Sequence, residues 1–166
     1  MKSRGFTLIE LVVVLSIIGI LLALGTLNFS GWQKKNQVER YTKELYSDIQ
    51  EARTDAIYTK FRRGIVLSAN SVTFRRYSSD SDAVGTPIST KQLPVPISWS
   101  AWANPAANRI DFNIRGVMTD PGTKVVCFQN TENAAYDAII ISPVLTGMGK
   151  VINRANNCDQ GNVTRK

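Results

Sequence analysis

The stretch that decides the fold is residues 5–29, GFTLIELVVVLSIIGILLALGTLNF, whose one charged side chain is Glu10. As a helix rising about 1.5 Å per residue, residues 11–29 would cover roughly 28 Å, close to the hydrocarbon thickness of a bilayer. The stretch therefore predicts a transmembrane helix over residues 6–29. The rival interpretation is a secretory signal cleaved near residues 23–25. Its apolar region would exceed the usual ~7–15 residues and would hold Glu10 inside or beside it.

Glu10 has two interpretations. Thr7 and Glu10 match the S/T-x-x-E capping box, in which both side chains satisfy free amides at the start of a helix. We also expect a carboxylate beside an apolar layer to have a partner cation, because a charged side chain at mid-membrane costs about 2.5–3.5 kcal/mol. Cleavage after Gly5 would supply one by freeing the amine of Phe6. The two roles stay open at this point.

Residues 5–10, GFTLIE, followed by an uninterrupted apolar helix, resemble the class III signal of type IV pilins and type II secretion pseudopilins. The resemblance implies that residues 1–5 are a leader, that a prepilin peptidase cuts between Gly5 and Phe6, and that the new Phe6 amine is methylated. It also implies that Glu10 meets the Phe6 amine of a neighbouring subunit in a filament. Leu27 departs from the family, since many members carry proline there.

An amphipathic helix is expected after the apolar stretch, over residues 30–60. No proline occurs before Pro87, so the two segments can form one rod of about 50 residues. Apolar side chains recur at spacings of three and four, which indicates a stripe that must rest on other elements. The stripe consists of Val38, Tyr41, Leu45, Ile49, Ala52 and Ala56.

Residues 61–166 are expected to form a β-rich globular domain. A period of two predicts a hairpin of residues 65–67 and 72–77, with further strands at residues 109–114, 125–129, 138–142 and 150–153. Residues 78–90 are rich in Ser, Asp, Gly and Pro and predict a mobile loop. Trp99 and Trp102 are interpreted as packing anchors rather than a ligand cage. A long helix followed by an antiparallel sheet is an α+β plan.

This order of elements agrees with the pilin fold. More narrowly, residues 109–122 (RIDFNIRGVMTDPG), 124–130 (KVVCFQN) and 138–154 (AIIISPVLTGMGKVINR) resemble the GspH/FimT group of minor pseudopilins and minor pilins. The resemblance implies a single-pass protein of the cell inner membrane with its carboxy-terminal domain in the periplasm. Prepilin peptidase and other pseudopilins or pilins are the implied partners.

The composition argues against an enzyme. The chain has no histidine, which excludes Ser-His-Asp and Cys-His catalysis and most zinc sites, and it contains no nucleophile elbow or P-loop. Residues 80–85 contain a fragment of a calcium-loop pattern without the later acidic ligand, and we expect a solvated turn there. No cofactor and no metal are expected.

The two cysteines are Cys127 and Cys158. In an oxidising compartment an even pair favours a disulfide, which here would close a loop of about 30 residues worth roughly 3–4 kcal/mol. This supports a periplasmic domain. The alternative is a buried Cys127 with a free thiol at Cys158.

Two functions fit these features. The first is a minor pseudopilin, similar to protein H of the type II secretion system. The second is a FimT-like type IV minor pilin involved in pilus biogenesis or DNA uptake. A formal net charge of +7 is a mild surplus and does not by itself indicate DNA. FimT-like DNA binders carry a Gly-Arg-x-Arg element where this chain has GKVINR, so Lys150 and Arg154 are the candidate contacts. Phosphate binding requires such residues to cluster.

Overall fold

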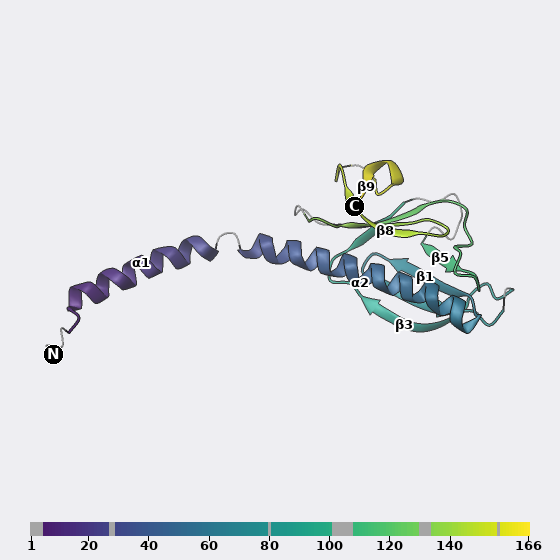
Figure 1. Ribbon diagram of the computed structural model, residues 1–166, viewed down its shortest axis with the longest axis horizontal. Coiled ribbons are helices and arrows are strands. Elements are labelled where there is room, and N and C mark those ends of the chain that lie inside the picture. The colour runs from purple at the N-terminus through teal and green to yellow at the C-terminus, as the bar shows by residue number, and fades with distance from the viewer. Residues whose placement is uncertain (1–4, 27–28, 80, 101–107, 130–133, 156) are drawn as a thin grey trace.

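The computed structural model describes residues 5–26, 29–79, 81–100, 108–129, 134–155 and 157–166. Helix α1 runs over Leu8–Thr26 and helix α2 over Phe29–Thr59. Figure 1 shows the two helices drawn out along the long axis, with the strands gathered around the carboxy-terminal part of α2. None of the helices in the described part of the chain combines the length and the hydropathy that a membrane crossing requires. The predicted span and the single rod both include residues 27 and 28, which lie outside the described residues.

Helix α2 covers the globular domain with the stripe that its spacing predicts. Tyr41 is half-buried, and the other five predicted positions are buried. Thr42 joins the stripe because its hydroxyl donates to the Val38 carbonyl at 2.8 Å and is thereby satisfied inside the core. The helix ends at Thr59. Lys60 takes a left-handed conformation with φ 56° and turns the chain towards the first strand.

The strands form two antiparallel sheets. The first has the order β3-β2-β1-β5 and the second the order β4-β6-β7-β8-β9. A long helix followed by antiparallel sheets confirms the predicted α+β plan. The strands are β1 (Arg63–Ser68), β2 (Ser71–Arg76), β3 (Thr86–Gln92), β4 (Ile97–Trp99), β5 (Arg109–Phe112), β6 (Lys124–Phe128), β7 (Ala138–Ile141), β8 (Thr146–Val151) and β9 (Val163–Arg165).

The prediction of a mobile loop at residues 78–90 is wrong from residue 86 onward. Thr86–Gln92 is strand β3, which pairs with β2 at the edge of the first sheet. An edge strand needs hydrogen bonds on one side only, so it accommodates Pro87, and the β2–β3 register shifts at that point, between Phe74 and Arg75. Three further differences are β8, which begins at Thr146 rather than at residue 150, and the short strands β4 and β9, which were not predicted.

The second sheet is buried on both faces. Val126 and Phe128 of β6 face the main core beneath α2, whereas Val125 and Cys127 face a smaller core on the opposite side. The carboxy-terminal segment covers this smaller core with Cys158 and with Val163 of β9. The segment also contains the short helix η1 (Gln160–Asn162). Trp99 packs against the main core, as predicted, and Trp102 lies outside the described residues.

Candidate functional site

The start of α1 forms the predicted capping box. The Thr7 amide and hydroxyl each donate to Glu10 Oε2 at 3.1 Å, and the Glu10 amide donates to Thr7 Oγ1 at 3.3 Å. Phe6, immediately before this cap, is 83% exposed. In the single chain, therefore, Glu10 serves as a helix cap at an exposed end of the molecule, and its carboxylate lies on the surface within reach of a second chain.

Helix α1 presents apolar side chains to its surroundings in every direction. Large hydrophobic residues occupy nearly every position of its first four turns, and each is between 46% and 82% exposed. At 3.6 residues per turn, consecutive exposed positions surround the whole helix rather than forming one stripe. Such a surface must be covered by lipid or by other apolar helices. The residues are Leu8, Ile9, Leu11, Val12, Val13, Val14, Leu15, Ile17, Ile18, Ile20, Leu21 and Leu22.

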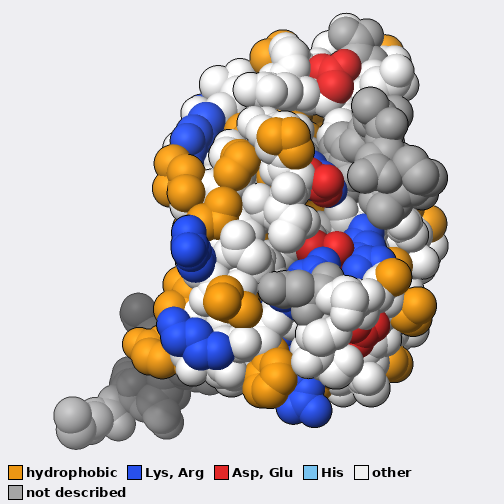
Figure 2. Space-filling view, turned by 90° about the vertical axis from the view of Figure 1, so that its right-hand side faces the viewer, with side chains coloured by type: hydrophobic (Ala, Val, Ile, Leu, Met, Phe, Trp, Pro, Cys, Tyr) orange, Lys and Arg blue, Asp and Glu red, His pale blue; other side chains and the backbone are white. Residues whose placement is uncertain are grey.

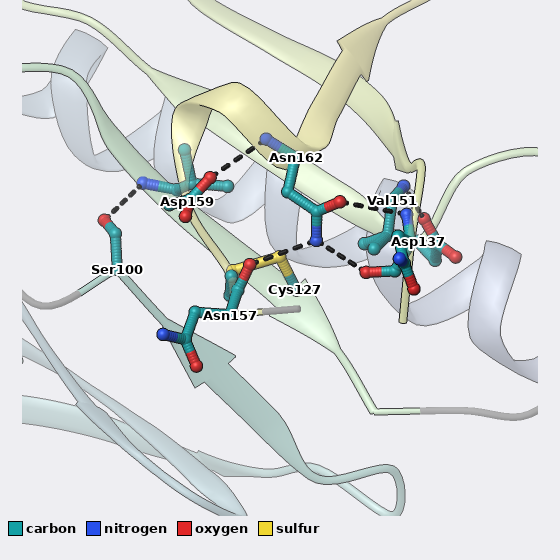
Figure 3. Close-up of a disulfide and its surroundings, with 10 residues drawn as sticks. Ser100, Cys127, Asp137, Val151, Asn157, Asp159 and Asn162 are labelled. Atoms are coloured by element: carbon teal, nitrogen blue, oxygen red, sulfur yellow. Dashed lines mark hydrogen bonds between the residues drawn. A yellow bond between two sulfur atoms is a disulfide. The ribbon is translucent and has the colours of Figure 1, made fainter. Parts of the chain in front are cut away.

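A disulfide joins Cys127 of β6 to Cys158 in the carboxy-terminal segment, which confirms the predicted pair (Figure 3). Both cysteines are buried in the smaller core, with 5% and 9% of their surface exposed. Nearby, the Asn162 side chain holds the segment in place by donating to the carbonyls of Asn153 at 2.6 Å and Asn157 at 3.1 Å. The tail is thus attached covalently and through hydrogen bonds to the outer face of the second sheet.

A buried carboxylate fastens the same region. Asp137, which is fully buried, precedes β7 and lies beside β8 (Figure 3). One carboxylate oxygen accepts from the Val151 amide at 2.8 Å, and the other pairs with Arg154 Nη2 at 2.8 Å. The sequence analysis did not find this pair, because nothing in the spacing of two residues 17 apart distinguishes them. The one signal is an acidic residue placed directly before an apolar strand.

Comparisons with known proteins agree with this description, both in the amino-terminal segment and in the fold. Residues 1–26 match the family model of the prokaryotic N-terminal methylation motif. The type IV minor pilin FimU of Pseudomonas aeruginosa has a similar structure, with a TM-score of 0.53 and 14% identity over 70% of this chain and 91% of that chain. The chain has a type IV pilin-like fold. The minor pseudopilin EpsH of the type 2 secretion system of Vibrio cholerae is also similar, with a TM-score of 0.52 and 10% identity over 68% and 94% of the two chains. At such identities the likeness shows the fold, and no curated protein matches the sequence.

The candidate DNA contacts Lys150 and Arg154 do not form one basic stripe with Arg165, the next basic residue of the described tail. Arg154 is engaged by the buried Asp137. Lys150 lies opposite Thr164 in the β8–β9 ladder, and Arg165 lies opposite Gly149. Successive residues of a strand point to opposite faces, so Lys150 and Arg165 project from different sides of the sheet. On the end of the molecule in Figure 2, basic side chains likewise occupy separate patches with acidic and apolar side chains between them.

Residues 81–85, the described part of the fragment that resembles a calcium loop, belong to a turn organised by Asp82. Its Oδ1 accepts from the amides of Val84 and Gly85, and its Oδ2 accepts from the amide and hydroxyl of Ser78. The hydrogen bonds from Gly85 and Ser78 hold the pKa of the Asp82 carboxyl far below its ordinary value. Both carboxylate oxygens of Asp82 therefore accept hydrogen bonds from within the turn. Elsewhere in the described residues no group of three or more potential metal ligands comes together.

Proposed function

We propose that this chain is a minor subunit of a pilus-like filament. A prepilin peptidase cleaves it between Gly5 and Phe6 and methylates the Phe6 amine. Residues 6–29 anchor it in the inner membrane, with the carboxy-terminal domain in the periplasm, until it assembles with other pilins or pseudopilins. The observation that carries the proposal is the methylation motif at residues 1–26, joined to a helix whose apolar surface faces outward on all sides.

The disulfide supports the periplasmic placement. Disulfides persist in oxidising compartments, which include the bacterial periplasm, and are rare in the reducing cytosol. Cys127 and Cys158 both lie in the globular domain, so the bond supports a position of that domain on the oxidising side of the membrane.

More narrowly, we propose a minor pseudopilin of a type II secretion system, similar to protein H. The alternative is a type IV minor pilin, which needs the same leader, helix and fold, and the similar structures include one protein of each kind. Within that alternative, DNA uptake receives the least support. Arg154 is engaged by a buried acid, and Lys150 and Arg165 lie on opposite faces of the sheet.

For Glu10 we propose a role that changes on assembly. In the single chain its carboxylate caps α1 through Thr7. In the filament it also meets the Phe6 amine of a neighbouring subunit. The net contribution of a hydrogen bond to a charged group is about 1.5–3 kcal/mol, roughly ten- to 150-fold in an equilibrium constant. The charge of Glu10, rather than its capping capacity, is then what assembly requires.

Two variants separate these roles. Glu10→Gln retains an oxygen for the cap and loses the charge, so it should insert into membranes normally and enter sheared filaments roughly tenfold less than wild type. Thr7→Ala removes the cap and keeps the charge, which costs the helix start about 0.5–2 kcal/mol and should reduce incorporation less. Immunoblots of the membrane and sheared-filament fractions measure both. If Glu10→Gln assembles like wild type, Glu10 is a cap alone.

A further inference from the structure

The first turns of α2 contribute no fully buried side chain to the globular domain. Val38 is the first buried residue of the helix, and residues 29–37 are exposed or half-buried throughout. At helical rise, the nine residues 29–37 place the start of α2 about 13 Å from Val38. This collar, residues 29–37, lies directly between the apolar α1 and the folded domain (Figure 1).

The collar carries an exposed aromatic pair. The rings of Phe29 and Trp32 stack with centroids 5.9 Å apart, and the two residues are 54% and 60% exposed. Residues three apart on a helix share one side, so the pair forms a single apolar surface. Tryptophan has a large apolar ring and one polar N–H group, and it is enriched where hydrocarbon meets water. This surface fits the edge of a bilayer better than it fits bulk water.

The charge of the collar is positive. Lys34 and Lys35 are its charged residues, and the Lys35 side chain is 44% exposed. The nearest acid along the helix is Glu39, which lies 4.0 Å from Lys35 and accepts from the Ala135 amide at 2.8 Å. That hydrogen bond directs the Glu39 carboxylate towards the globular domain. The collar itself contains no carboxylate, so its formal charge is +2, and the carboxylate of Glu39 just beyond it pairs with Lys35.

We infer that the collar binds the headgroup layer of an anionic phospholipid bilayer. The rings of Phe29 and Trp32 lie at the edge of the hydrocarbon, and the ammonium groups of Lys34 and Lys35 contact lipid phosphates. The collar then fixes the depth of the anchor and holds the folded domain clear of the lipid. The inference rests on the proposed function, which places residues 6–29 in the membrane.

Depth-dependent fluorescence quenching tests this inference on the full chain. Wild type and Trp32→Phe are reconstituted in phosphatidylcholine vesicles with and without phosphatidylglycerol, using lipids brominated near the headgroup or near the chain end. Subtracting the Trp32→Phe signal isolates Trp32, and because this residue is exposed, the variant leaves the core intact. We expect the Trp32 emission to lie at a short wavelength and to be quenched more by the shallow bromines than by the deep ones.

Charge is tested with Lys34→Gln/Lys35→Gln. In wild type we expect stronger shallow quenching in vesicles with phosphatidylglycerol than in vesicles without it, and we expect this difference to be lost in the double variant. Lys60→Gln, which removes one positive charge just beyond the far end of α2, should keep it. A chain that fails to float with vesicles overturns the membrane anchor and with it the collar. A chain that floats while Trp32 stays unquenched overturns the collar alone, including the case in which a second subunit covers the rings.

Discussion

Replacing Cys127 and Cys158 together by serine should lower the free energy of unfolding of the globular domain by about 3–4 kcal/mol. The bond closes a loop between residues 31 apart in sequence, and it fixes the tail over the smaller core. Without it, the unfolded chain gains entropy, and the carboxy-terminal segment that carries Val163 is no longer linked covalently to β6. For a domain of this size the melting temperature should fall by roughly 12–20 °C.

The measurement is thermal unfolding of the full chain in detergent, followed by near-ultraviolet circular dichroism. Wild type under reducing conditions is the matched control, because it loses the same bond without a change in sequence, and it should melt close to the double variant. Equal melting temperatures for oxidised wild type and the double variant would contradict a stabilising bridge. Non-reducing peptide mapping shows independently whether the two cysteines are linked.

Asp137→Ala should be similarly damaging, at about 3 kcal/mol. The substitution leaves the Val151 amide without its acceptor and removes the buried partner of Arg154. A buried unsatisfied donor costs about 1–3 kcal/mol, and a hydrogen bond to a charged group contributes about 1.5–3 kcal/mol. Asp137→Asn should be milder than Asp137→Ala, since its side-chain oxygen can still accept from Val151.

The same thermal unfolding experiment measures these variants together with two arginine substitutions. Arg154→Ala should destabilise the domain, because it leaves the carboxylate of Asp137 buried without a cation. Arg115→Ala makes the same change of net charge at an exposed loop position, and it should stay within about 0.5 kcal/mol of wild type. If Arg154→Ala and Arg115→Ala behave alike, the Asp137–Arg154 pair does not hold the tail.

How much of the fold the sequence predicts depends on how local the signal is. The stripe of α2 was predictable because helical spacing repeats over many residues, and all six predicted positions are buried or half-buried. Strand β3 was not, because Pro87 and its polar neighbours read as a loop, and only pairing with β2 makes them a strand. The short strands β4 and β9 likewise depend on partners far along the chain.

The candidate site divides in the same way. Thr7 and Glu10 lie three residues apart, so their capping box follows from local sequence. The cysteine pair was predictable because it is the one possible intramolecular pairing of two cysteines. The bond between Asp137 and Arg154 depends on how β7 and β8 lie beside each other, and no local pattern encodes it.

The most direct test of the central claim is the mass of the mature amino terminus. Protein extracted from membranes of cells that contain a prepilin peptidase should begin at Phe6 and carry one added methyl group on its amine. The same protein from cells lacking the peptidase should retain Met1 and no methyl group. A mature chain beginning at Thr26, or an intact Met1 in the presence of the peptidase, would contradict processing and assembly as a pilin-like subunit.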